Sequence, residues 1–197
     1  MKKTILSLLL TLAAFIVAPA QETSAHLKFK GVPIDGTLAE FVSNMKKVGF
    51  THIVTLDENA LLTGDFAGFK ECTIVVYSTP QPQEKVHTVA VIFPGHDDWP
   101  SLQRDYETLK SMLSEKYGGP AECVETFHRD SYTPRSNSDK LYELKMNECT
   151  WVSTYTLPEG DIYLSIASND LLSTFVILGY IDWKNTEAVK DKAMDDI

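Results

Sequence analysis

The chain has 197 residues and a formal charge of −9, with 27 acidic and 18 basic side chains. A surface this negative repels nucleic-acid phosphates and anionic lipid headgroups, so we expect no nucleic-acid partner and no binding to membrane surfaces. Hydrophobic residues make up 44% of the sequence and aromatic residues 10%, which is typical of an ordinary folded domain.

The first 20 residues have the three parts of a secretory signal peptide. Lys2 and Lys3 form a positive start, Ile5–Val17 is an apolar run, and Ala18–Ala20 supplies small residues for cleavage. Because the apolar run is too short to span a bilayer, we expect no membrane span in the mature chain. These features predict a soluble periplasmic or secreted protein, with residues 21–197 forming a single domain.

The first helix is predicted after a short extended lead at His26–Lys30. Thr37 and Glu40 have the spacing of a capping box, in which the hydroxyl accepts from an early helix amide and the carboxylate reaches back. Gly49 ends the helix. The residues of its apolar face are Leu38, Phe41, Val42, Met45 and Val48.

After the first helix, the hydrophobic period changes to two, which predicts strands. Short polar or proline-containing breaks separate these strands, as in an antiparallel meander. The predicted strands are Thr51–Leu56, Ala60–Phe66, Cys72–Ser78 and Val86–Phe93.

The stretch from Trp99 to Pro120 is the best-defined helix of the sequence. Asp98 can cap it, Pro100 suits its first turn, and Gly118 supplies a left-handed end. The apolar residues recur at steps of three and four: Leu102, Tyr106, Leu109, Met112 or Leu113, and Tyr117. The residues expected to face solvent are Arg104, Asp105, Glu107, Lys110 and Glu115.

Strand patterns then return, followed by a short amphipathic helix over residues 185–195. Together the elements predict an α+β fold with antiparallel β-meanders and two main amphipathic helices packed on the sheet. The predicted strands are Glu122–His128, Leu141–Met146, Cys149–Thr156, Ile162–Ala167 and Thr174–Tyr180.

Two half-repeats, residues 31–94 and 95–183, share the order of a helix, a glycine stop and several strands. Both contain Glu-Cys-Thr, at Glu71–Thr73 and Glu148–Thr150. The stretches VPIDGTLAEFVSNMKKVGF and LKSMLSEKYGGPAECVETF each contain a helix ended by glycine and followed by a strand. In this order of elements the chain resembles small secreted bacterial proteins of the β-lactamase-inhibitor-protein-like fold. The resemblance concerns architecture and implies no inhibitory function.

Three cysteines remain in the mature chain, Cys72, Cys123 and Cys149. In an oxidising compartment, one disulfide and one free thiol is the simplest arrangement. A hairpin centred near residue 135 would place Cys123 opposite Cys149, our preferred pair. A shifted register would place Cys123 opposite Asn147 and forbid the bond, and the alternative to a disulfide is three buried thiols.

Two clusters are candidates for a functional site. His96, Asp97, Asp98 and Trp99 form a turn with an imidazole, two carboxylates and an indole, although capping by Asp98 and packing of Trp99 would also explain it. The second candidate is an aromatic binding rim, with a flexible solvated loop as its alternative. Its residues are Tyr132, Arg135, Trp151 and Tyr155.

The sequence contains none of the common motifs for zinc, nucleotide or dinucleotide binding and no nucleophile elbow. We therefore predict no catalytic residues, no metal and no cofactor. The favoured function is a monomeric, exported binding module for a protein, a peptide or a cell-envelope component. The alternatives are a small periplasmic hydrolase, whose residues converge only in the fold, and a structural accessory protein of the envelope.

Overall fold

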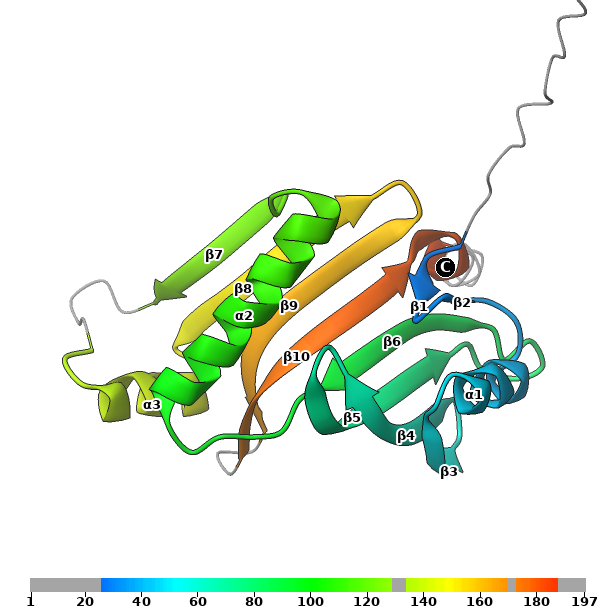
Figure 1. The fold of residues 1–197 in the computed structure, drawn as a ribbon, viewed down its shortest axis with the longest axis horizontal. Coiled ribbons are helices and arrows are strands. Elements are labelled where there is room, and N and C mark those ends of the chain that lie inside the picture. Colours follow the sequence, from blue (N-terminus) through cyan, green and yellow to red (C-terminus); the bar gives the residue numbers. More distant parts are fainter. Residues whose placement is uncertain (1–25, 129–133, 170–172, 188–197) are drawn as a thin grey trace, which may run out of the picture.

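The computed structural model describes residues 26–128, 134–169 and 173–187, and it has an α+β architecture (Figure 1). A large antiparallel sheet forms one layer, and three helices lie on one of its faces. The elements in chain order are β1 (Lys28–Phe29), β2 (Val32–Pro33), α1 (Leu38–Lys47), β3 (Thr51–Leu56), β4 (Asn59–Phe66), β5 (Phe69–Ser78), β6 (Val86–Ile92), α2 (Trp99–Tyr117), β7 (Glu122–Phe127), α3 (Asn137–Lys145), β8 (Cys149–Leu157), β9 (Gly160–Asn169) and β10 (Ser173–Asp182).

The eight long strands have the order β3-β4-β5-β6-β10-β9-β8-β7. The two halves of the chain therefore meet at the centre, where β6 and β10 pair antiparallel with Ala90 opposite Gly179. Helix α1 precedes the strands of one half and α2 precedes those of the other. The predicted α+β class with antiparallel meanders is confirmed.

Helix α1 begins and ends where its sequence predicts. The Thr37 hydroxyl accepts from the Glu40 amide at 3.3 Å, and a Glu40 carboxylate oxygen accepts from the Thr37 amide at 3.0 Å. This reciprocal pair satisfies amides that the first turn cannot pair internally. Leu38, Phe41 and Met45 are buried on the sheet, whereas Val48 is 38% exposed beyond the last turn.

Helix α2 is capped by Asp98, whose carboxylate accepts from the Ser101 amide at 2.9 Å. Leu113 packs inward, while Met112 is 48% exposed, which decides between the two alternatives for the apolar face. The prediction that Asp105 faces solvent is wrong. It is buried because the imidazole of His96, from the preceding turn, lies 2.6 Å from its carboxylate.

The stretch Leu141–Met146, predicted to be a strand, belongs to helix α3. Ser136 caps this helix by accepting from the Asp139 amide at 3.1 Å, and Asp139 accepts in return from the Ser136 amide. Such a capping box favours a helix over the strand that the apolar spacing predicted. Residues 129–133 of the preceding loop lie outside the described residues.

The N-terminal segment is joined to the end of the sheet by the buried carboxylate of Asp182. It accepts from the Leu27 amide at 2.8 Å and the Asn185 amide at 3.0 Å, and the His26 ring lies 3.1 Å away. Residues 183–187 are helical, but most of the helix predicted at 185–195 lies outside the described residues, as does the predicted signal peptide at 1–20. Within the described ranges, no helix is long and apolar enough to cross a membrane.

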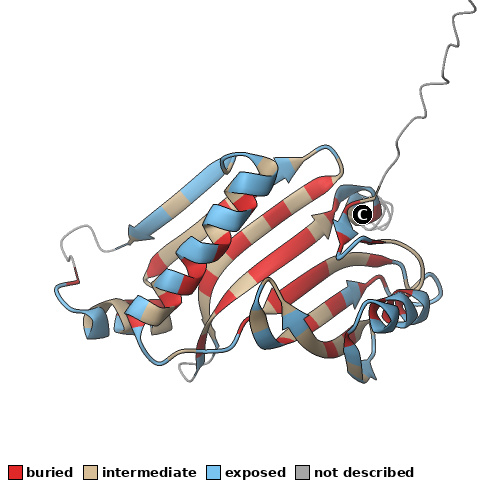
Figure 2. Cartoon of the chain, in the orientation of Figure 1, coloured by how far each residue is buried: buried red, intermediate tan, exposed pale blue. Residues whose placement is uncertain are grey.

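The core lies between the sheet and its helices (Figure 2). Along the central strands, buried residues alternate with half-buried ones, and the buried residues face the helices. Aromatic rings fill the two ends of this layer, with Phe29 against Phe66 at one end and Trp99 against Trp151 at the other. Within the described residues, the helices thus cover one face of the sheet only.

Candidate functional site

The opposite face of the sheet has no described helix over it, and we call it the open face. Successive side chains of a strand point to opposite faces of the sheet, and residues paired across neighbouring strands point to the same face. The open face can therefore be followed from pair to pair: Val75 pairs with Ala90, Ala90 with Gly179, and Gly179 with Tyr163. The apolar residues of the open face are Leu61, Val75, Ala90, Ile92, Val152, Tyr163, Phe175, Ile177 and Ile181.

The open face is unusually poor in charge for a solvated sheet surface. Of the strands β3 to β10, only β5 contains a lysine or arginine, Lys70, and it lies beside the turn that joins β4 to β5. The strands β3 and β6 each contain one histidine, His52 and His87. Acidic residues occur at the margin, at Glu122 and Asp161, and threonines occupy most of the remaining positions. An antiparallel sheet with one solvated face normally alternates apolar and polar residues, so these strands depart from the usual pattern.

Aromatic side chains contribute a large part of the open face. Tyr77 is 38% exposed and Trp183, whose indole donates to Asp161 at 3.0 Å, is 36% exposed at the margin. The Tyr163 ring lies over Gly179, where an added Cβ would sit 2.0 Å from the ring. Burial raises the pKa of Tyr163, which is consistent with a ring packed flat against its neighbours.

The size of the open face is comparable to one side of a protein–protein interface. The eight strands are spaced about 4.8 Å apart and have a mean length of about eight residues at about 3.4 Å per residue, so one face of the sheet covers roughly 900 Å². Each partner in a standard interface contributes about 800 Å².

The predicted aromatic rim does not assemble. Tyr155 is buried beneath α2, where its hydroxyl donates to the Lys110 carbonyl at 3.0 Å, because the alternation of β8 directs it toward the helices. Trp151 faces the same way and packs edge-on against Trp99, with ring centroids 4.8 Å apart. Arg135 is exposed ahead of α3, and Tyr132 lies outside the described residues.

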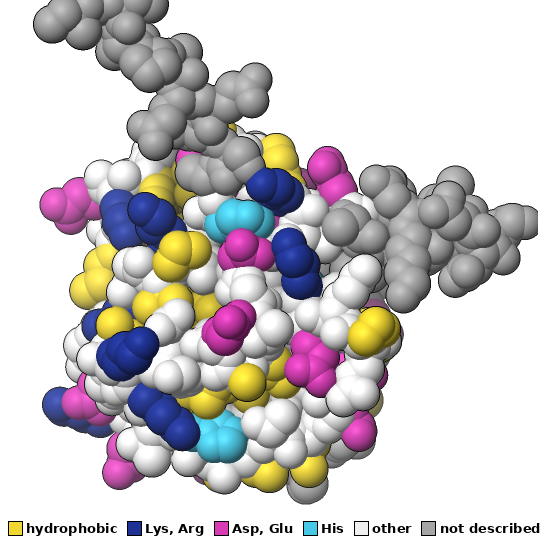
Figure 3. All heavy atoms as spheres, turned by 90° about the vertical axis from the view of Figure 1, so that its right-hand side faces the viewer, with side chains coloured by type: hydrophobic (Ala, Val, Ile, Leu, Met, Phe, Trp, Pro, Cys, Tyr) yellow, Lys and Arg dark blue, Asp and Glu magenta, His cyan; other side chains and the backbone are white. Residues whose placement is uncertain are grey.

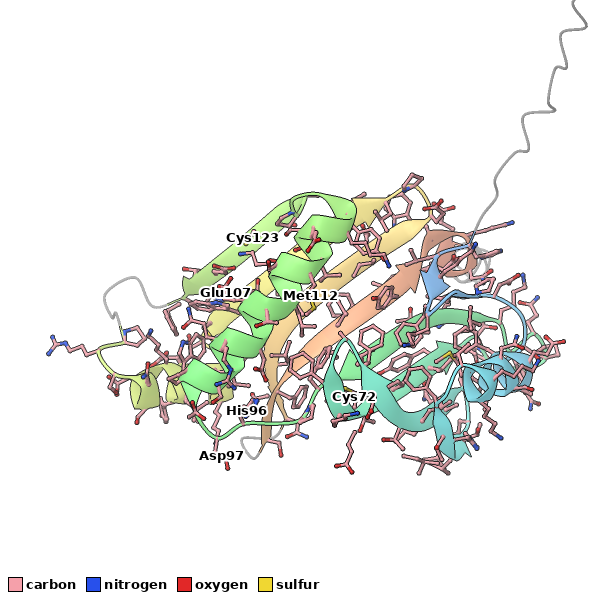
Figure 4. The ribbon with its side chains drawn as sticks, viewed as in Figure 1. Cys72, His96, Asp97, Glu107, Met112 and Cys123 are labelled. Atoms are coloured by element: carbon pink, nitrogen blue, oxygen red, sulfur yellow. The ribbon has the colours of Figure 1, made fainter. Side chains whose placement is uncertain are left out.

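The turn before α2 has a structural role. Asp98 caps the helix, Trp99 is buried, and His96 pairs with Asp105. Asp97 is exposed, and Figure 4 shows it and His96 at the N-terminal end of α2. The four residues therefore do not converge on one ligand position.

The predicted Cys123–Cys149 disulfide is wrong. All three cysteines are free, because Cys123 pairs with Ser153 in the sheet and Cys149 pairs with Phe127. The helix α3 occupies much of the connection that a simple hairpin would have used, and this moves the register of β8 by four residues. Figure 4 shows Cys123 on the edge strand β7 and Cys72 in the other half of the sheet.

The densest group of reactive side chains lies between α2 and β7. Glu125 accepts from Lys110 at 2.5 Å, from Tyr106 at 3.2 Å and from the Cys123 thiol at 3.3 Å, and Ser153 lies 2.7 Å from the Tyr106 hydroxyl. Burial raises the pKa of Tyr106, so its hydroxyl stays protonated and donates. This network joins the helix to the edge strand, and Cys123 and Glu125 are its exposed members.

No group of three or more potential metal-binding side chains occurs within the described ranges. Comparisons with protein-family models, with curated proteins and with solved structures found no match. The function must therefore be argued from the geometry of the molecule.

A sheet face or a loop rim was the expected binding surface, but the residues of the open face were not identified, although the sequence carries a signal for them. Strands β6 and β10 are apolar at both alternate sets of positions, in VHTVAVI and STFVILGYID. A strand with one face buried and the other in solvent alternates apolar and polar residues instead. Reading each strand for both faces would have identified the second apolar surface.

Proposed function

We propose that this protein is an exported, non-catalytic binding protein that holds a partner protein on the open face of its sheet. The observation that carries the proposal is the extent of apolar and aromatic surface with no described helix above it. Contiguous exposed apolar surfaces of several hundred Å² mark interaction sites in soluble proteins. Export, the periplasmic or secreted location and the tandem half-repeats belong to the same proposal, supported by the signal-like first 20 residues and the order of elements.

The chemistry of the open face indicates the kind of partner. Its centre is apolar, with Tyr77, Tyr163 and Trp183 as rigid aromatic groups of the type that carry binding energy in interfaces. Its margin is acidic, at Glu122 and Asp161, and the whole chain has a charge of −9. A matching partner presents an apolar patch bordered by lysine or arginine.

The test is capture of the partner from a cell-envelope extract by the mature chain. Val75→Lys and Ile177→Lys each put a charge at the centre of the open face, and we expect each to abolish capture. Met112→Lys and Tyr142→Lys are the matched controls, because both replace exposed apolar residues on the helical side, at 48% and 54% exposure. Capture that survives both open-face substitutions would refute the proposal.

A small hydrolase is the second candidate, favoured by the exposed Cys123 thiol beside Lys110 and Glu125. In such an enzyme the thiolate would attack an ester carbonyl, expel the alcohol and form a thioester that water then hydrolyses. The test is hydrolysis of a chromogenic ester by the mature chain. Activity that disappears in Cys123→Ser would favour this candidate over the binding protein.

A further inference from the structure

A cavity of about 640 Å³ opens on the helical side of the molecule, away from the open face. Its walls are the turn that joins β1 to β2, the end of α2, the turn between β4 and β5, and the hairpin between β8 and β9. Figure 3 shows the neighbouring end of the molecule, where basic, acidic and hydrophobic side chains lie next to one another. The volume lies within the range of small-molecule sites in proteins.

Apolar and aromatic side chains form one part of the cavity lining. Phe66, Leu157 and Tyr180 contribute to its lining, and Tyr180 packs edge-on against Phe29 with ring centroids 5.2 Å apart. Tyr180 is 6% exposed, yet its hydroxyl makes no hydrogen bond to any described residue. The hydroxyl oxygen is not fully enclosed, so a molecule in the cavity can reach it and accept its hydrogen bond.

The rim of the cavity is positive in a protein that is strongly negative overall. Lys28, Lys30 and Lys116 line it, and none of them forms an ion pair with a described residue. The one carboxylate in the lining belongs to Glu159, and the imidazole of His26 is already paired with Asp182 and Asp35. The Lys116 amine lies 4.8 Å from the centroid of the Tyr117 ring, which holds it at the mouth.

We propose that this cavity binds an organic anion with an apolar body, such as an amphipathic carboxylate. The apolar body occupies the interior beside Phe66 and Leu157, and the carboxylate accepts hydrogen bonds from the rim lysines and from the Tyr180 hydroxyl. Burial raises the pKa of Tyr180, so its hydroxyl remains a donor at neutral pH. The site is separate from the open face and does not depend on the function proposed for it.

Titration calorimetry of decanoate and decanol with the purified mature chain tests whether binding requires an anionic group. The two probes share an apolar chain and differ in the anionic group. We expect decanoate to bind at least about tenfold more tightly than decanol, because only the carboxylate gains ion pairs with the rim lysines and a charge-assisted hydrogen bond from Tyr180. Equal affinities, or no binding of decanoate, would overturn the proposal.

Variants of the lining locate the site. We expect Lys28→Gln with Lys116→Gln to weaken decanoate binding about tenfold, and Tyr180→Phe to weaken it about fivefold. Lys46→Gln with Lys145→Gln makes the same change of charge away from the cavity and should leave the affinity unchanged. Ile177→Lys should also leave it unchanged, since it alters only the open face. Equal losses in the lysine pair and its control, or a loss in Ile177→Lys, would place binding elsewhere.

Discussion

Asp182 is the residue that most directly joins the two ends of the described chain. Its carboxylate is fully buried and accepts from the Leu27 and Asn185 amides. Asp182→Ala would leave both amides buried without an acceptor, so we expect the free energy of unfolding to fall by about 3 kcal/mol. Urea denaturation followed by circular dichroism measures the change.

Asp97→Ala is the control for that substitution, because Asp97 is exposed and makes no hydrogen bond to a described residue. Its free energy of unfolding should change by less than about 0.5 kcal/mol. A similar loss in both variants would mean that general charge, rather than the buried hydrogen bonds, accounts for the effect.

The three thiols differ in reactivity because they differ in burial. Cys72 and Cys149 are buried, and burial raises the pKa of Cys72 and raises that of Cys149 to about 11. Only Cys123 is exposed, so we expect a thiol reagent to modify one cysteine of the native protein and all three after denaturation. Mass spectrometry of the alkylated chain counts them. If only one cysteine is modified in the denatured, unreduced protein, the other two form a disulfide, which would contradict the three free thiols.

His87 makes stability depend on pH. Burial lowers the pKa of His87 below its ordinary value of 6.5, so below that pH the unfolded chain binds a proton that the folded chain resists. Stability is therefore complete above about pH 6.5 and falls as the pH decreases toward the lower folded pKa. We expect the loss between about pH 7 and pH 5.5 to be smaller in His87→Gln. Identical pH profiles for the two proteins would exclude this role.

At the residue scale, hydrogen bonds between residues close in the sequence were predictable, and contacts between residues far apart in the sequence were not. The roles of Thr37 and Asp98 follow from groups within three residues, and the sequence shows them directly. The burial of Tyr155 under Lys110 depends on how α2 crosses β8, which no local pattern contains. The candidate rim failed for that reason.

At the scale of elements, α3 shows where strand and helix patterns compete. Its stretch holds few apolar residues and buries only Glu143 and Leu144, so the hydrophobic period is a weak guide. The capping box at Ser136 and Asp139 was the stronger signal. A simple hairpin centred near residue 135 leaves no room for this helix, so the predicted cysteine register was wrong as well.

The stability of α3 should depend on its cap. Ser136→Ala removes the acceptor of the Asp139 amide, and we expect it to destabilise this helix by about 1 kcal/mol. Faster amide hydrogen exchange within residues 137–145 reports the loss. Ser138→Ala in the same turn should leave exchange unchanged or slow it slightly, since alanine is the better helix former. Equal exchange in the two variants would exclude the cap as the cause.

At the scale of the whole molecule, the fold class followed from the order of elements, because two amphipathic helices and their strands can bury their apolar faces in a two-layer arrangement. The sheet order was not predictable, since the pairing of β6 with β10 joins segments about 90 residues apart. Without that order, the apolar outer positions of separate strands could not be seen as one surface. The candidate site was missed at this scale rather than at the scale of single residues.

The central claim is that the open face is where a partner binds, and site-specific photocrosslinking in intact cells tests it most directly. A benzophenone amino acid replaces Tyr77 on the open face or Tyr142 on the helical side, two tyrosines that are both well exposed. We predict a crosslinked adduct from position 77 and none from position 142. An adduct from position 142 with none from position 77 would contradict the account.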